Sequence, residues 1–147
     1  MKLSSPAFEN GEKIPKKYTG EGQDISPPLK WEDVPAQAEE LFLLCEDPDA
    51  PGKEPFIHWL LYKIPTGQSS LDENNHGKAL EGLNSFGSTG YGGPMPPAEH
   101  GPHHYHFRLF AVDQPLKLYP GASREQVDRA LQGHILDEAE IVGTYER

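Results

Sequence analysis

The sequence predicts a mainly antiparallel β-sandwich that carries one or two short helices and forms a single domain over residues 1–147. Three observations lead to this fold class. Short runs rich in branched and aromatic residues recur along the chain, turn formers separate them (15 Gly and 15 Pro), and only one segment carries clear helix start and stop signals. Many short strands with abundant turns are typical of two packed antiparallel sheets.

The first half of the chain supplies the strand that we expect to be most buried. Residues 1–30 mix apolar positions with turn formers and predict two or three short strands. Residues 41–46, LFLLCE, form a continuous apolar run, which is typical of a strand buried on both faces. This strand ends abruptly at Asp47, because Pro48 and Pro51 forbid a helix or a central strand there.

A second long strand is expected at residues 56–64, FIHWLLYKI, between two prolines. Its alternation gives two faces, with Ile57, Trp59, Leu61 and Lys63 on one and Phe56, His58, Leu60 and Tyr62 on the other. His58 is therefore expected on an otherwise apolar face. The bond between Glu54 and Pro55, squeezed between a turn and this strand, is a candidate for a cis peptide.

The irregular span 65–105 follows, and its aromatic residues Phe86 and Tyr91 indicate that it is ordered. Residues 104–112 then alternate like a half-buried strand, with Tyr105, Phe107, Leu109 and Ala111 on one face and His104, His106, Arg108 and Phe110 on the other.

The last part of the chain predicts one helix between two short strands. Residues 116–119, LKLY, predict a strand, and the tail 139–147 alternates like a terminal strand. Between them, Ser123 is suited to be an N-cap, Gln126 closes a capping box, and Gly133 ends the helical pattern.

Composition excludes several classes of protein. The formal net charge is −10, with 13 Lys and Arg against 23 Asp and Glu, so the surface repels nucleic-acid phosphates and anionic bilayers. The single cysteine, Cys45, lies in an apolar run and is expected to be a buried core residue. No stretch has the length of a membrane span and the N-terminus lacks an apolar signal region, so we expect a cytoplasmic protein.

Three polar segments are candidates for one site. Asp47 and Asp49 follow the first buried strand, His58 lies on the next strand, and His103 and Tyr105 follow a Gly- and Pro-rich loop. A hairpin between the two strands brings Asp47 beside His58. Imidazole, phenol and the loop's free backbone N–H groups donate to a phosphate or carboxylate, whereas an aspartate accepts from an ammonium group or orders a histidine tautomer. These residue types indicate a pocket for a small anion or zwitterion.

Other interpretations of the same residues stay open. His58 is also suited to be a core histidine bonded to a backbone carbonyl, Asp47 and Asp49 to form turns, and Tyr105 to pack in the core. A metal or other cofactor is not expected, because His104 and His106 point away from His103 on a strand. The alternative is an enzyme, a hydrolase or isomerase that uses His58 or His103 as general base and Asp47 to orient it. The sequence shows no evident nucleophile for such an enzyme.

The order of these motifs resembles that of the phosphatidylethanolamine-binding protein family, also called Raf kinase inhibitor-like proteins. The likeness rests on four ordered segments, Asp47-Pro48-Asp49-Ala50-Pro51, His58-Trp59, Gly93-Pro94-Met95-Pro96-Pro97 and Gly101-Pro102-His103-His104-Tyr105-His106-Phe107. It continues into residues 24–31 and 133–145, so it covers nearly the whole chain. The compact ends are similar to those of the bacterial and archaeal branch.

The resemblance implies an antiparallel β-sandwich with one anion pocket at the strand ends. Matched residue by residue, the family's pocket positions fall on Asp47, Asp49, His58, Pro97, His103 and Tyr105. Three neighbouring positions depart from the common pattern: Phe56 replaces Trp, Met95 replaces the Cys of many microbial relatives, and His104 replaces Arg. Family members bind phosphorylated or zwitterionic head groups and, in animals and plants, regulate kinases or transcription complexes by docking.

We therefore expect a non-enzymatic binding module for a small phosphate- or carboxylate-bearing ligand such as phosphorylethanolamine. Its expected ligand-binding residues are Asp47, Asp49, Phe56, His58, Met95, Pro97, His103 and Tyr105. Ligand binding would alter the loop 92–97 and with it a docking surface for a kinase or other partner. A protease or kinase inhibitor is a further alternative, and an exposed edge strand near either terminus would permit a homodimer.

Overall fold

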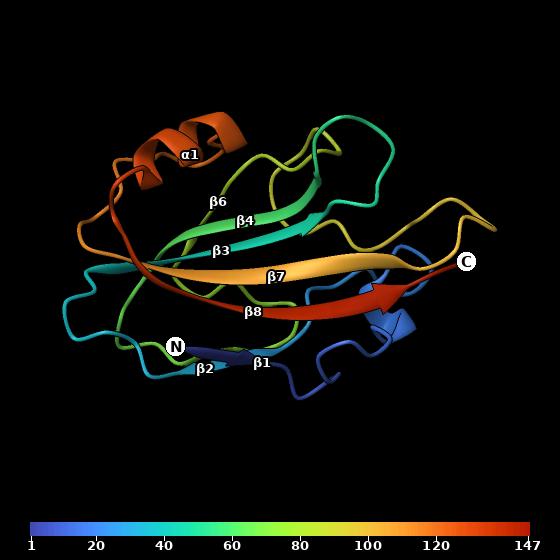
Figure 1. Ribbon diagram of the computed structural model, residues 1–147, viewed down its shortest axis with the longest axis horizontal. Helices are drawn as coiled ribbons and strands as arrows, with labels where there is room; N and C mark the ends of the chain where they lie inside the picture. Colours follow the sequence, from blue (N-terminus) through green and yellow to red (C-terminus); the bar gives the residue numbers. More distant parts are fainter.

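Two antiparallel sheets and one α-helix make up the computed structural model, which describes all residues from 1 to 147 (Figure 1). The larger sheet has the strand order β6-β4-β3-β7-β8, and the smaller one has the order β1-β2-β5. In chain order the elements are β1 (Lys2–Ser4), a 3-10 turn (Lys16–Tyr18), β2 (Leu29–Glu32), β3 (Glu40–Asp47), β4 (Phe56–Ile64), β5 (Ser70–Leu71), β6 (Leu80–Glu81), β7 (His103–Val112), α1 (Arg124–Leu131) and β8 (Ile135–Tyr145). The predicted antiparallel β-sandwich with a short helix is confirmed.

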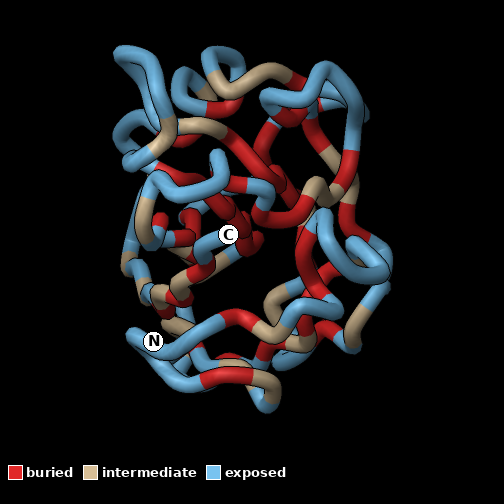
Figure 2. Tube along the Cα trace, turned by 90° about the vertical axis from the view of Figure 1, so that its right-hand side faces the viewer, coloured by how far each residue is buried: buried red, intermediate tan, exposed pale blue.

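The larger sheet is covered on both faces. A cluster of 20 buried residues fills the space between the sheets and includes Trp31 and Phe107, and a second cluster of 12 joins Phe110 to Val127 and Leu131 of α1. In Figure 1, α1 lies on one side of β3 and β4 while β1 and β2 lie on the other. Figure 2 shows the buried segments gathered in the interior and the exposed ones in the loops around them. Every residue of β3 is buried, as its unbroken apolar run predicts.

The alternation predicted for the strand that became β7 is confirmed. Tyr105, Phe107, Leu109 and Ala111 all lie in the cluster between the sheets. On the opposite face His104 is exposed, whereas Phe110 packs in the cluster under α1. This strand therefore carries polar side chains at its start and apolar side chains on both faces at its end.

The predicted helix is also present, with its capping box. The Ser123 hydroxyl oxygen accepts from the backbone N–H of Gln126 at 3.2 Å, and the Gln126 side chain accepts from the backbone N–H of Ser123 at 2.9 Å. The helix ends at Leu131, and Gly133 follows with a φ of 81°. No helix of the structure has the length and apolar character that crossing a bilayer requires.

Residues 116–119 do not form the predicted strand. The backbone N–H of Leu116 donates to the Glu40 carboxylate at 3.1 Å, and its carbonyl accepts from the Lys63 ammonium at 2.5 Å. Side chains therefore take the backbone hydrogen bonds of Leu116 that pairing with a neighbouring strand would need. Leu116 and Leu118 are still buried, because the segment covers the sheet beside α1.

Strand β4 has the predicted bounds but not the predicted faces. Cys45 pairs with Trp59 and Glu46 pairs with Ile57, so His58 has no partner on β3 and forms a β-bulge. As a result Ile57 packs in the cluster under α1 while Trp59 packs between the sheets. His58 shares an edge-to-face contact with Tyr105, at 5.1 Å between ring centroids, instead of the predicted face with Leu60 and Tyr62.

The prediction of a cis bond between Glu54 and Pro55 is wrong, since the chain has no cis peptide. Residues 51–55 are all exposed. Nothing packs against this turn to select the cis form, and the trans form is intrinsically favoured by about 0.5–1 kcal/mol.

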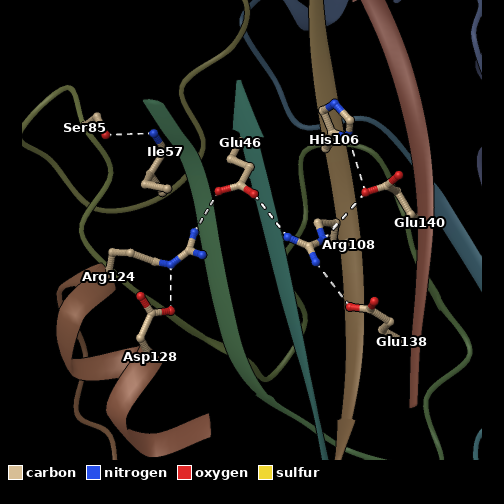
Figure 3. Close-up of polar contacts among 9 residues, drawn as sticks. All are labelled: Glu46, Ile57, Ser85, His106, Arg108, Arg124, Asp128, Glu138 and Glu140. Atoms are coloured by element: carbon tan, nitrogen blue, oxygen red, sulfur yellow. Dashed lines mark hydrogen bonds and ion pairs between the residues drawn. The ribbon is translucent and has the colours of Figure 1, made fainter. Parts of the chain in front are cut away.

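A chain of charged side chains fastens α1 to the larger sheet (Figure 3). The Glu46 carboxylate accepts from Arg124 at 2.9 Å and from Arg108 at 3.2 Å. Arg108 continues to Glu138 at 3.3 Å and Glu140 at 3.6 Å. Glu46 is buried, so this carboxylate depends on both guanidinium groups for its neutralisation.

Candidate functional site

A cavity of about 430 Å³ lies at one end of the larger sheet. At this end β3 finishes and β4 and β7 begin (Figure 1). It is lined by seven of the eight residues predicted to bind a ligand: Asp47, Phe56, His58, Met95, Pro97, His103 and Tyr105. A volume of this size suits a small ligand. Three larger hollows lie beside α1 (about 770 Å³ and about 530 Å³) and at the edge of the smaller sheet (about 880 Å³). None of the three is lined by a buried histidine or aspartate, whereas the cavity at the strand ends is lined by Asp47, His58 and His103.

A hydrogen-bonded chain of three side chains forms one wall of the cavity. The Oδ2 atom of Asp47 lies 2.6 Å from Nδ1 of His103, and Nε2 of His103 lies 2.6 Å from Nδ1 of His100. Asp47 and His103 are both buried, whereas His100 is exposed. Because an ionised carboxylate only accepts, His103 donates from Nδ1 to Asp47, and a second hydrogen bond joins Nε2 of His103 to Nδ1 of His100.

Asp49, the eighth predicted residue, does not line the cavity. One of its oxygens accepts from the backbone N–H of His104 at 2.8 Å and lies 2.7 Å from the imidazole Nδ1 of the same residue. Partial burial acts to raise the pKa of Asp49, but these bonds from His104 outweigh it and hold the pKa below its usual value. The backbone N–H of Asp49 donates to Asp47 at 2.8 Å, so the turn orients the carboxylate that does line the cavity.

The bulge at His58 is held by a single glycine of the loop. The imidazole Nδ1 of His58 donates to the carbonyl of Gly92 at 2.6 Å, and the backbone N–H of Gly92 donates to the carbonyl of His58 at 3.0 Å. Burial lowers the pKa of His58, against the opposing effects of the Gly92 carbonyl and the Asp47 and Asp24 carboxylates. The neutral imidazole therefore has its proton on Nδ1 and a lone pair on Nε2.

Tyr105 and an apolar rim complete the cavity. The Tyr105 ring is buried beside His58, and burial first, then the nearby Asp47 carboxylate, raises the pKa of its hydroxyl, which stays protonated. Phe56 and Phe86 contact each other edge to face at 4.8 Å between centroids, and both contact His58. Phe86 and Met95 are 50% and 44% exposed, so the mouth of the cavity is apolar and open to solvent.

Fewer backbone N–H groups of the Gly-rich loop are free than expected, although that of Met95, which lines the cavity, has no partner within the protein. The N–H of Gly92 is bonded to His58, and that of Gly93 donates to the side chain of Asp24 at 2.7 Å. The three prolines of the loop, Pro94, Pro96 and Pro97, have no N–H. The loop is instead fastened from outside, because the Pro94 carbonyl accepts from Gly20 and the Pro96 carbonyl accepts from Arg147.

Sequence reasoning missed three residues of this site. Ser85 and Phe86 line the cavity although they follow β4 by more than twenty positions, in a span without periodicity. The backbone N–H of Ile57 in β4 donates to the Ser85 hydroxyl at 2.7 Å (Figure 3). No local sequence pattern predicts this contact. His100 lies within the histidine-rich stretch, which was the available signal, but only the fold shows that it caps His103.

The fold and the site together define a class of protein. It is an antiparallel β-sandwich with a cavity lined by histidine, aspartate and tyrosine at one end of its larger sheet. The sequence model of the family described as phosphatidylethanolamine-binding protein matches residues 4–146. The chain belongs to this family.

Three similar proteins match this chain over nearly their whole length. A UPF0098 protein of Methanothermobacter thermautotrophicus is 45% identical and the match covers 100% of this chain and 99% of that protein. A structure from Chlamydia trachomatis, described as a phosphatidylethanolamine-binding protein homologue, has a TM-score of 0.93 at 43% identity, covering 99% of this chain and 97% of that one. YbcL of E. coli, described as a member of the mammalian family, has a TM-score of 0.92 at 29% identity, covering 99% and 98%.

Proposed function

We propose that this protein binds a small phosphate- or carboxylate-bearing ligand in the cavity at the strand ends and does not transform it chemically. One observation supports this above the others. A buried Asp47–His103 pair, 2.6 Å apart, opens with Tyr105 onto a cavity of about 430 Å³ that has an apolar rim. Buried polar groups in a concave, partly apolar site are what orients and selects a small ligand.

An enzymatic role is the second candidate, because the Asp47–His103 pair has the geometry of an orienting carboxylate and a general base. Two features weigh against it. The Nε2 atom of His103, which a base would use, is already bonded to His100. Cys45 lies in the core, and burial raises the pKa of its thiol, so the chain's one cysteine is not a nucleophile.

Docking of a protein partner would involve the rim of the cavity. The loop 92–97 is fastened by Gly20, Asp24 and Arg147, which limits how far its backbone moves. We therefore propose that a bound ligand acts on a partner through the exposed side chains of Phe86 and Met95. NMR relaxation of backbone and methyl groups, measured with and without ligand, tests this proposal. Unchanged relaxation of the Met95 methyl group would show that ligand binding does not affect the rim.

The test of binding is calorimetric titration with phosphorylethanolamine. We expect saturable 1:1 heats for the unaltered protein and at least about tenfold weaker binding for Tyr105→Phe and His103→Ala, since each loses a polar group of the cavity. His134→Ala is the matched control, because His134 also pairs with a carboxylate, Asp113 at 2.9 Å, away from the cavity. Absence of binding by the unaltered protein, or equal losses in all three variants, would contradict the proposal.

A further inference from the structure

Two histidines of β7 share one face of the larger sheet outside the strand-end cavity. His104 and His106 are two positions apart, so their side chains lie on the same side of the strand with about 6.6 Å between their Cα atoms. The side chain of His104 is 50% exposed and that of His106 is 29% exposed. Both imidazole rings are therefore accessible to an ion from solvent.

A carboxylate holds each of these rings at Nδ1. Nδ1 of His104 lies 2.7 Å from Oδ2 of Asp49, which also accepts from the backbone N–H of His104 at 2.8 Å. Nδ1 of His106 lies 3.2 Å from Oε2 of Glu140 on β8. In the neutral ring, such a bond places the proton on Nδ1 and the lone pair on Nε2. No hydrogen bond within the protein engages Nε2 of either ring.

The two carboxylates flank the histidine pair from opposite directions along β7. Asp49 lies beyond the end of β3 and contacts His104 near the start of β7. Glu140 pairs in register with Arg108, which follows His106 along the strand. Figure 3 shows one ring nitrogen of His106 turned toward Glu140 and the other on the opposite side of the ring, toward the start of β7. The free Nε2 atom of His106 therefore faces the end of the strand where His104 lies.

The charges around the pair favour a cation. Asp49 and Glu140 place a carboxylate behind each ring, and the whole chain has a formal net charge of −10. Arg108, the next side chain on this face of β7, contacts three carboxylates, including that of Glu140 at 3.6 Å. Its positive charge is therefore offset. An imidazole whose second nitrogen is bonded to a carboxylate is the usual form of a histidine that binds a metal ion.

We propose that His104 and His106 bind one divalent transition-metal ion through their Nε2 atoms, and that the site prefers Cu²⁺ to Zn²⁺. Imidazole suits both ions, and Cu²⁺ forms the stronger complexes. No group of three or more His, Cys, Asp or Glu side chains is placed to hold a metal ion, so the protein supplies two ligands here and water fills the other positions. Neither histidine lines the strand-end cavity, so this inference is independent of the proposed function.

The other histidines offer no comparable pair. His100 and His103 hydrogen-bond to each other, and Nδ1 of His58 donates to a backbone carbonyl. His134 has a carboxylate at its Nδ1 atom, that of Asp113 at 2.9 Å, but no second histidine two positions away. His134→Ala is therefore the matched control, because it removes a histidine with the same kind of partner and leaves the pair intact.

The experiment is titration of the whole protein with Cu²⁺ at about pH 7.5, since protons compete with the metal for imidazole. We expect one Cu²⁺ per chain and an electron paramagnetic resonance spectrum with splitting from two imidazole nitrogens. His104→Ala and His106→Ala should each weaken binding at least about tenfold, because the second ligand then no longer acts at high effective concentration. Glu140→Gln should weaken binding about tenfold with both nitrogens still coordinated. Zn²⁺ should bind more weakly and shift the ring resonances of His104 and His106 in NMR spectra.

Several outcomes would overturn the proposal. A copper spectrum with one coordinated nitrogen or none would do so, as would equal affinity of the unaltered protein and the variant that lacks both histidines. A loss in His134→Ala as large as that in His104→Ala would show that copper does not select the pair. The spectrum is recorded on the unaltered protein, so it decides the question even if a variant does not fold.

Discussion

Nδ1 of His103, the first residue of β7, lies 2.6 Å from Oδ2 of Asp47, the last residue of β3, and both side chains are buried. This contact joins the ends of two neighbouring strands at the wall of the cavity. It also fixes the tautomer of His103, because the carboxylate accepts the Nδ1 proton. The bond therefore has both a structural and a chemical consequence, and each can be measured.

Replacing Asp47 with alanine leaves the buried Nδ1–H group of His103 without its acceptor. We expect the free energy of unfolding to fall by about 2–4 kcal/mol, as for other buried charge-assisted bonds that lose one partner. Asp113→Ala, which breaks the more exposed pair with His134, should cost at most about 1 kcal/mol. Chemical denaturation of both variants checks this, and equal losses would show that the Asp47–His103 bond stabilises no more than a surface pair.

The buried, neutral state of His58 predicts a pH-dependent stability. Its pKa is lowered in the folded protein, chiefly by burial, so between that value and about 6.5 the unfolded chain binds the extra proton. The contribution of His58 is therefore fully present above about pH 6.5 and is lost as the pH falls through the lowered pKa. Unfolding free energies between pH 5 and 8 should decline more steeply on the acid side for the unaltered protein than for His58→Leu. Parallel curves would contradict this assignment.

Gly92 allows the close approach that closes the aromatic wall. A Cβ atom at this position would overlap the Phe86 ring, so Gly92→Ala must displace that ring. Because Phe86 is half exposed, the ring can turn outward, and we expect a small loss of stability but about tenfold weaker ligand binding. Gly67→Ala, with no atom within 4 Å of the added Cβ, is the control. Unchanged ring resonances of Phe86 in the NMR spectrum of Gly92→Ala would refute the clash.

Glu46 is the shared partner of Arg108 and Arg124 in the network that fastens α1 (Figure 3). Glu46→Gln should lower the free energy of unfolding by about 1–2 kcal/mol, between the values for exposed and buried pairs. Glu125→Gln removes an exposed pair with Arg129 on α1 and should cost no more than about 0.5 kcal/mol. Thermal unfolding at low and high salt measures both. If the stability loss of Glu46→Gln vanished at high salt, the ion pairs of Glu46 would behave like exposed ones.

Local patterns predicted most of the framework. The apolar run of β3, the alternation of β7 and the capping box at Ser123 each depend on neighbours within a few residues, and each is found in the structure. Residues 116–119 failed because Glu40 and Lys63, remote in sequence, take the backbone bonds of Leu116. The strand propensity of a segment carries no information about side chains that lie far away in the sequence.

The site was harder to predict for the same reason. The residue types at Asp47, His58 and His103 were visible in the sequence, but the bulge that turns His58 toward Tyr105 depends on pairing between β3 and β4. The hydrogen-bonding state of the loop was also hidden, because the N–H groups of Gly92 and Gly93 are bonded to distant groups. The pocket therefore has fewer backbone donors than its glycine content indicates, and the free N–H group of its loop is that of Met95.

The most direct test of the account is a chemical-shift titration of the isotope-labelled protein with phosphorylethanolamine at pH 6, followed through backbone amides and histidine rings. We expect saturable shifts that centre on Asp47, His58, Met95 and Tyr105, which line the strand-end cavity. Shifts confined to the hollow beside α1 or to the edge of the smaller sheet, or no saturable shifts at all, would contradict it.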